Sequence, residues 1–141
     1  REEYDVLPEY VPLELTESAF LEDEVGMYRR MESLRERGFL VSMDDFGTGY
    51  SSFGMLQQYN FDIMKIDMSF IRQIETNPKT KSMLRFLIDM AHEMGIYIVA
   101  EGVETEVQAD FLKKSHCDYI QGYYYYRPIP QEEFRKLLDE M

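Results

Sequence analysis

Five short apolar runs of strand character recur along the chain, and a polar side chain stands at or just past the end of each. The runs cover residues 11–15, 39–43, 63–66, 96–100 and 119–120, and a helix-like stretch follows nearly every one. Strands that alternate with helices predict a parallel sheet with right-handed crossovers. Five β/α units cannot close a standard eight-stranded barrel. We therefore predict an α/β fold that is either a small open sheet or the last part of a barrel.

Helix signals fill the intervals between these runs. Apolar residues at helical spacing, or short apolar stretches, predict helices over 24–37, over 52–59, and from Pro130 to the end. Asn77 before Pro78 is typical of an N-cap followed by proline at the first helical position. Thr105 and Gln108 have the spacing of a capping box. For the helix that starts at Pro78 and ends at Gly95, we predict a buried face made of Met83, Leu87, Met90 and Met94.

Composition narrows the classes of function. A chain of 141 residues with 45% hydrophobic content can form one domain with a proper core. Its formal charge of −12 argues against binding long nucleic acid, although a small phosphate ligand remains possible where metal ions bridge the charges. One cysteine cannot form an internal disulfide, which favours a cytoplasmic location. No apolar run approaches the ~20 residues of a membrane span, so we expect no direct membrane insertion, and any anchor would lie outside this chain.

The segment from Asp44 to Ser52 carries the strongest chemical signal. Adjacent carboxylates repel each other at the end of a strand, and a divalent cation would relieve that cost. Gly47 and Gly49 permit tight turns, while Thr48, Ser51 and Ser52 offer hydroxyl groups. A solvated, aspartate-rich turn is the alternative interpretation of this segment taken alone.

Further polar residues stand at the other strand ends. Glu14 lies within an apolar run and needs a partner or a metal, unless it simply faces solvent. Glu101 follows the clearest strand, and Glu104 is placed either for chemistry or for the first turn of a helix. Lys65 ends another strand, where it could hold a nucleophilic water or a phosphate, or form a structural salt bridge.

The last strand is followed by Gln121, which could hydrogen-bond a ligand, and by four tyrosines at 123–126. These tyrosines could stack on a base, but we expect most of them to pack under the rim of a barrel. His92 and His116 show no metal-ligand spacing, and we interpret them as a surface or packing residue and a helix-terminus residue. Cys117 is interpreted as a small buried hydrophobe.

Taken in order, these segments resemble the EAL family of cyclic di-GMP phosphodiesterases. The similarity runs from about residue 10 to the end of the chain. The matching pieces are Leu13-Glu14-Leu15-Thr16-Glu17, the nine residues Asp44 to Ser52, Lys65-Ile66-Asp67, Val99 to Thr105, and Gln121-Gly122-Tyr123 with Arg127-Pro128.

The resemblance implies a modified TIM barrel that hydrolyses one phosphodiester of cyclic di-GMP to linear pGpG with magnesium or manganese. It implies metal-binding roles for Glu14, Asp44, Asp45 and Glu101, with Asp45 on the second metal. Among these, Asp45 and Glu101 act in catalysis together with Lys65, which orients water or steadies the phosphate. It also implies ligand contact for Gln121. Glu17 and Glu104 would anchor the loop after Asp45, a loop that serves dimer contacts in the family.

Two family features are missing from this sequence. The Glu-Ala-Leu signature is absent, and so is the metal-site asparagine of an early strand. We therefore expect residues 1–141 to be a partial EAL domain, the carboxyl-terminal five β/α units of a TIM-like (β/α)8 barrel, with an incomplete two-metal site. Exposed strand edges would favour a homodimer or a domain-swapped oligomer.

Three interpretations of function remain open on the sequence. The first is that the chain is part of an active phosphodiesterase whose isolated fragment is weak or inactive. The second is a non-catalytic module that binds cyclic di-GMP or mediates dimers. The third is a plain structural fragment. We favour the first for the parent protein.

Overall fold

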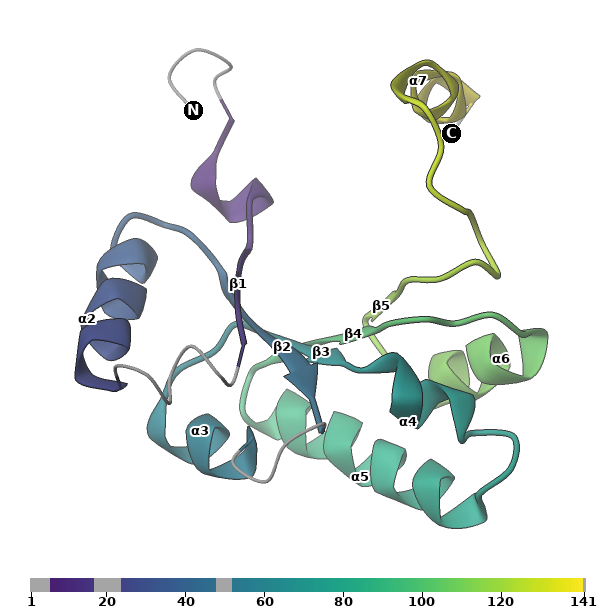
Figure 1. Cartoon of the computed structure of the whole chain (residues 1–141), viewed down its shortest axis with the longest axis horizontal. Helices are drawn as coiled ribbons and strands as arrows, with labels where there is room; N and C mark the ends of the chain where they lie inside the picture. Colours follow the sequence, from purple (N-terminus) through teal and green to yellow (C-terminus); the bar gives the residue numbers. More distant parts are fainter. Residues whose placement is uncertain (1–5, 17–23, 48–51, 141) are drawn as a thin grey trace.

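A five-stranded parallel sheet organises the computed structural model of the chain, which describes residues 6–16, 24–47 and 52–140. The strands lie in sequence order, so each one pairs with the next along the chain (Figure 1). Their bounds are β1 Leu13–Leu15, β2 Val41–Phe46, β3 Ile63–Ile66, β4 Tyr97–Ala100 and β5 Tyr119–Ile120. The predicted parallel α/β arrangement is therefore confirmed.

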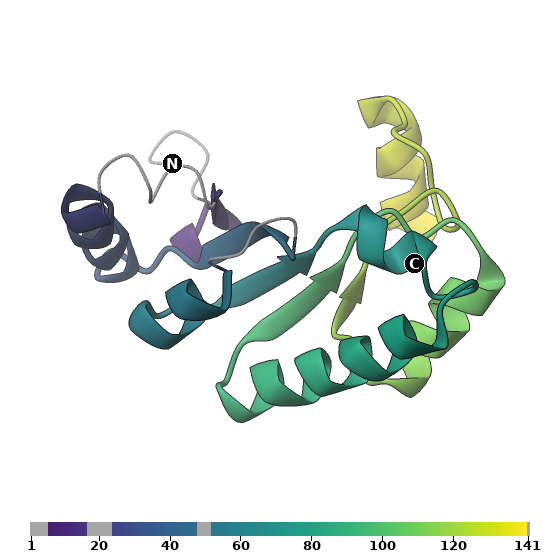
Figure 2. The same cartoon turned by 60° about the horizontal axis from the view of Figure 1, so that its bottom comes forward.

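Helices connect the strands and cover one face of the sheet. Their bounds are the 3-10 turn η1 Pro8–Tyr10, then α2 Glu24–Arg35, α3 Ser52–Gln58, α4 Met68–Arg72, α5 Pro78–Glu93, α6 Glu106–Lys114 and α7 Gln131–Glu140. In both views α3, α5 and α6 lie along the same side of the strands, while α7 stands apart beyond the end of β5 (Figures 1 and 2). No helix in the described ranges is both long and apolar enough to span a bilayer.

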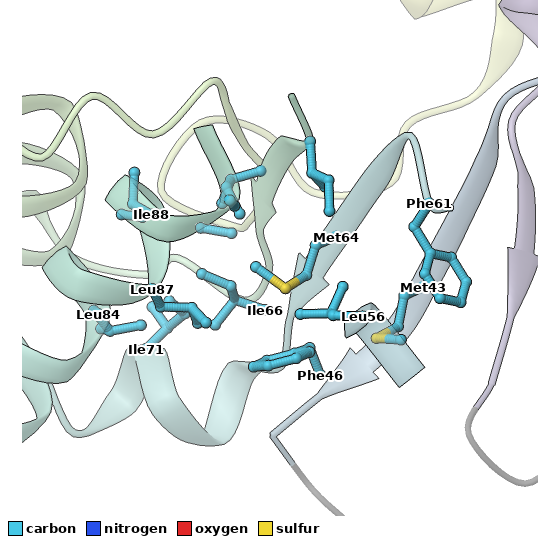
Figure 3. Packing of buried hydrophobic residues seen from close by; sticks show 14 of the residues in the cluster. Met43, Phe46, Leu56, Phe61, Met64, Ile66, Ile71, Leu84, Leu87 and Ile88 are labelled. Atoms are coloured by element: carbon cyan, nitrogen blue, oxygen red, sulfur yellow. The ribbon is translucent and has the colours of Figure 1, made fainter. Parts of the chain in front are cut away.

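The hydrophobic core fills the layer between the sheet and these helices. Met64 and Ile66 of β3 point toward Leu84, Leu87 and Ile88 of α5 (Figure 3). Because successive residues of a strand face opposite sides, Lys65 must point to the other face of the sheet. The core thus fixes the direction of the lysine.

Two of the predicted helix starts are confirmed in detail. The Asn77 side chain accepts a hydrogen bond from the Lys79 amide at 3.0 Å, with Pro78 at the first helical position of α5. Thr105 and Gln108 form the reciprocal capping box of α6. Such caps satisfy backbone amides that have no partner within the helix.

The second strand departs from its predicted bounds. We expected it over 39–43, with both aspartates past its end, but β2 runs from Val41 to Phe46 and contains Asp44 and Asp45. Its pairing with β3 shifts register between Met43 and Phe46, and Asp45 adopts a φ of +56° at this irregularity. The bulge adds an extra residue to the strand at this point, so that β2 continues to the buried Phe46.

The buried face of α5 is also corrected. Met83 and Met94, which we expected to be buried, are exposed, and Met90 is only partly buried. Leu87 is buried as predicted, and the other core positions are Leu84, Ile88 and Ala91, with Thr80. Leu84 and Ile88 follow the same helical spacing one residue later, so periodicity alone could not choose between the two stripes.

Smaller differences concern element ends. Strand β1 begins at Leu13 rather than Val11, and β4 begins at Tyr97 rather than Ile96. Helix α2 ends at Arg35, after which a turn reaches Gly38, whose φ of +86° suits glycine. Helix α3 ends at Gln58 rather than Tyr59, and Met141 of the predicted last helix lies outside the described residues. The short helix α4 was not predicted.

Candidate active site

Lys65 of β3 is the centre of the candidate site. Its ammonium Nζ lies 2.8 Å from Glu14 Oε1, 3.0 Å from Asp44 Oδ1 and 2.9 Å from Glu101 Oε1. These carboxylates come from β1, from β2 and from the residue that follows β4. Parallel strands bring their carboxyl ends to one edge of a sheet, so residues far apart in sequence meet there. Four of the residues singled out in the sequence are thus brought together.

The pKa of Lys65 reflects a balance between burial and its acidic neighbours. The lysine side chain is only 12% exposed, and this burial by itself lowers the pKa. The close carboxylates of Glu14, Glu101 and Asp44 outweigh burial and raise the pKa of Lys65 above its ordinary value. Lys65 therefore stays protonated at neutral pH, where it offsets one of three converging negative charges.

The two aspartates differ in their surroundings. Asp44 Oδ1 is buried, and its close contact with Lys65 is an ion pair without the directed geometry of a hydrogen bond. Asp45 lies at the exposed rim. Partial burial, followed by repulsion from Asp44 and Asp67, raises the pKa of the Asp45 carboxyl, although Lys65 acts in the opposite direction. A cation bound near Asp45 would relieve this repulsion.

The loop after β4 holds Glu101 through its backbone. The Glu101 amide donates to the Ile66 carbonyl at 3.1 Å, which continues the pairing of β4 with β3. Gly102 then turns with a φ of +69°, and the Val103 amide donates to the Gln121 carbonyl at 3.1 Å. The carboxylate of Glu101 consequently projects from a segment tied to both neighbouring strands.

Gln121 lies at the same edge of the sheet but outside the lysine cluster. Its backbone amide donates to the Ala100 carbonyl at 2.9 Å, and the residue itself is exposed. It lines a hollow of about 600 Å³ between the segment after β5 and the apolar side of α7. Tyr123 and Arg127 line the same hollow, with the guanidinium carbon of Arg127 4.6 Å from the centre of the Tyr123 ring.

Of the two residues expected to anchor the loop after Asp45, the structure describes only Glu104. Glu104 forms an ion pair with Arg72 of α4 at 3.5 Å. Glu17 lies outside the described residues, as does the segment 48–51 that follows the second aspartate. The anchoring roles expected for Glu17 and Glu104 therefore stay predictions.

Several expectations for the surrounding residues are settled by burial. The four tyrosines at 123–126 are exposed, so the expectation that most of them pack is wrong for this chain. His92 Nε2 lies 3.0 Å from Asp118 Oδ2 near the surface, as expected for a histidine outside the site. Cys117 is partly buried, and burial raises the pKa of its thiol to about 11, which keeps the thiol unreactive at neutral pH.

The fit of a metal ion can be judged from the donor atoms. Carboxylate oxygens are the hard ligands that magnesium and manganese prefer, and Glu14, Asp44 and Glu101 supply three of them at one point. The buried Asp44 Oδ1 faces the Lys65 ammonium at 3.0 Å, so a metal ion that took this oxygen as a ligand would compete with the ammonium. Within the described ranges no three acidic, histidine or cysteine residues are arranged so that they could hold a metal ion. Glu14, Asp44 and Glu101 instead surround the Lys65 ammonium. The donor chemistry fits a divalent cation.

The fold and the site together define a parallel β/α protein with an acidic cluster around one lysine at its strand ends. The EAL domain family model matches residues 2–128, and the chain belongs to this family. The resemblance to the EAL family that the five sequence segments indicated is confirmed.

Curated proteins similar in sequence to this chain include a phosphodiesterase. The cyclic di-GMP phosphodiesterase NbdA of Pseudomonas aeruginosa is 39% identical over 92% of this chain. That alignment covers 16% of NbdA, and the chain spans between 16% and 25% of the length of the first curated relatives it matches.

Solved structures match the fold closely. The EAL enzyme Bd1971, in a form with cAMP and cyclic di-GMP bound, superposes with a TM-score of 0.91 at 33% identity, covering 98% of this chain and 36% of Bd1971. Klebsiella pneumoniae BlrP1, in a complex with manganese and cyclic di-GMP, gives a TM-score of 0.84 at 28% identity over 90% of this chain and 32% of BlrP1. The five parallel strands therefore correspond to part of an EAL (β/α)8 barrel, as predicted.

Proposed function

We propose that the protein carrying this chain hydrolyses one phosphodiester bond of cyclic di-GMP and releases linear pGpG. The main support is the convergence of Glu14, Asp44 and Glu101 within 3.0 Å of the Lys65 ammonium. This arrangement concentrates metal ligands and one cation at the end of the sheet where parallel β/α proteins bind substrate. The relative NbdA is named a cyclic di-GMP phosphodiesterase, and BlrP1 was solved with that dinucleotide and manganese.

In this proposal Glu14, Asp44 and Glu101 hold a magnesium or manganese ion, and Asp45 contributes to a second one. The bound metal supplies an activated water and neutralises charge on the phosphate oxygens. The described part of the chain holds three acidic residues at Lys65, so the full set of ligands would include groups beyond this cluster. Residues 1–141 remain proposed as a partial EAL domain.

Lys65 contributes a fixed positive charge. Its raised pKa keeps the ammonium protonated, so it can donate a hydrogen bond to a phosphate oxygen or orient the attacking water. Before metal and substrate arrive, the same ammonium keeps the carboxylates from repelling one another. Gln121, at the neighbouring strand end, is proposed to contact the dinucleotide, while Glu17 and Glu104 are proposed to anchor the loop after Asp45.

The test is direct hydrolysis. The whole protein that contains these residues is incubated with cyclic di-GMP and Mn²⁺, and pGpG is followed by chromatography. Glu101→Ala should lower kcat by roughly 10²- to 10³-fold, the range seen when one preorganised electrostatic group is removed from an active site. Glu106→Ala is the matched control, because this exposed glutamate lies in the first turn of α6, away from Lys65.

A wild-type protein that releases no pGpG under these conditions would overturn the proposal. So would a Glu101→Ala variant that is as active as the Glu106→Ala control.

A second candidate is a module that binds cyclic di-GMP without cutting it. The observation that favours it is the Lys65 ammonium itself, which already occupies the point where the described carboxylates converge. Calorimetric binding of cyclic di-GMP, with no pGpG formed in the presence of Mn²⁺, would support this candidate over hydrolysis.

A further inference from the structure

The short helix α4 contacts both the carboxyl end of β2, which carries Asp44 and Asp45, and the loop after β4, which carries Glu101. It begins directly after β3, and the Asp67 side chain caps it by accepting a hydrogen bond from the Ser69 amide at 2.9 Å. In Figure 1, α4 follows the end of β3, between the ends of β2 and β4. Lys65 lies only two residues before the cap, so the helix is directly continuous with the centre of the site.

The first contact joins α4 to the turn that follows β2 and its two aspartates. Gly47 adopts a φ of +100°, and a Cβ atom at this position would lie 2.9 Å from Cζ of Phe70 and closer still to Cε2. The Phe70 ring therefore occupies the space that the missing side chain of Gly47 leaves open. Gly47 comes two residues after Asp45, so the ring presses on the turn that ends the Asp44–Asp45 bulge.

The second contact joins α4 to the loop of Glu101. Gly102 has a φ of +69°, and a Cβ atom there would lie 2.5 Å from Cβ of Met68. The end of α4 and the turn after it add polar contacts to the same segment. Arg72, the last residue of α4, pairs with Glu104 at 3.5 Å, and Glu75 in the turn accepts a hydrogen bond from the Thr105 hydroxyl at 2.7 Å.

We propose that α4 is a positioning element that holds the Asp44–Asp45 end of β2 and the Glu101 loop at a fixed separation, through Phe70 on Gly47 and Met68 on Gly102. The inference rests on the proposed hydrolysis of cyclic di-GMP. Phe70 approaches Gly47 and Met68 approaches Gly102, so each would act through the backbone next to an acidic residue. A misplacement of about 1 Å in a reacting group can cost roughly 10²-fold in rate, which makes such spacing important for catalysis.

Removing the ring tests the proposal. Phe70→Ala in the whole protein should lower kcat by about 10- to 100-fold, while KM for cyclic di-GMP changes by less than about threefold, because the loops carry metal ligands rather than the outer contacts of the substrate. The Mn²⁺ concentration for half-maximal binding, measured by titration without substrate, should rise. Phe70→Leu should restore part of both values, since leucine still fills some of the space against Gly47.

Phe86→Ala is the matched control. It also removes one phenylalanine ring, but this ring is 76% exposed on α5. Its kcat, KM and Mn²⁺ affinity should stay at wild-type values. Should Phe70→Ala fail to fold, the same comparison is made with Phe70→Leu, for which a smaller change in the same direction is expected.

Hydrogen exchange separates this inference from the proposed activity. Amides of 44–47 and of 101–104 should both exchange faster in the Phe70 variant than in wild type. A wild-type protein without hydrolysis would overturn the activity, yet faster exchange in both loops would still support the linking role of α4. Exchange that rises in α4 alone, or a Phe70 variant with wild-type kcat and Mn²⁺ affinity, would overturn the inference.

Discussion

The carboxylates of this site suit a metal ion, but the same negative charges destabilise the site when no cation is bound. Three carboxylates that suit metal binding repel one another when no cation is present, and Lys65 offsets that repulsion. Its raised pKa means that the folded state binds this proton more tightly than the unfolded chain does. The resulting stabilisation is complete below the ordinary lysine pKa of 10.5 and is lost as the pH rises through the folded-state value.

Replacing this lysine should therefore weaken the metal-free fold. Lys65→Met is expected to lower the free energy of unfolding at pH 7 by about 1–3 kcal/mol, less than for a fully buried ion pair because Glu14 is half exposed. Mn²⁺ should restore part of this loss and should stabilise the variant more than it stabilises wild type. Urea unfolding followed by circular dichroism, in EDTA and in Mn²⁺, measures both effects.

Lys136→Met, on the exposed surface of α7, is the control for the loss of one charge. An equal response of wild type and Lys65→Met to Mn²⁺ would contradict the view that this ammonium and a metal serve the same carboxylates.

The sequence identified the residues that meet at Lys65, but it did not predict where the neighbouring Asp45 lies. Glu14, Asp44, Lys65 and Glu101 were identifiable because polar groups at the ends of apolar runs must converge in a parallel sheet. The position of Asp45 was not, because its exposure follows from a positive φ at a bulge that no local pattern announces. The catalytic and metal-binding roles of these residues stay predictions.

At the scale of elements, the cap of α6 supports the loop that bears Glu101. The buried Gln108 accepts hydrogen bonds through Oε1 from the Glu104 amide at 2.8 Å and from the Thr105 amide at 3.2 Å. One side chain thereby satisfies two backbone amides that the helix itself cannot satisfy.

Removing the Gln108 acceptor should lower the free energy of unfolding more than replacing it by another acceptor. Gln108→Ala is expected to lower the free energy of unfolding by about 1–3 kcal/mol, because it leaves two amides without their acceptor. Gln108→Glu keeps an acceptor at the third helical position and should cost less than Gln108→Ala, although burial of its carboxylate offsets part of the gain. Urea denaturation curves of the two variants measure this difference, and equal losses in both would contradict the capping role.

Elements with strong end signals were predicted well, and elements without them were not. Helix α5 was recognisable from Asn77 and Pro78, and α6 from its capping box. Strand β2 was displaced in the prediction because aspartate is depleted in strands, which made Asp44 and Asp45 look like a loop. Helix α4 is only five residues long, too short to establish a helical period.

For the whole molecule, the order of the strands was predictable but the exposure of the second sheet face was not. Alternation along β4 and β5 places Tyr97 and Tyr119 on the face opposite the buried Ile98, with their ring centres 6.3 Å apart. These rings are 53% and 57% exposed. The packing expected for the tyrosines at 123–126 failed for a similar reason, since burial there depends on surfaces that a local sequence pattern does not specify.

A sheet face on which Tyr97 and Tyr119 are exposed, in a sheet with β1 and β5 at its edges, should drive self-association of the isolated 141-residue chain. We expect its sedimentation coefficient to rise with protein concentration, in line with the expected dimer or swapped oligomer. Replacing both Tyr97 and Tyr119 by serine should shift the equilibrium toward monomer. Tyr126→Ser, which removes an exposed ring outside the sheet, should leave the equilibrium unchanged. A chain that stays monomeric at all concentrations, or a control that dissociates as readily as the double variant, would show that this face does not mediate association.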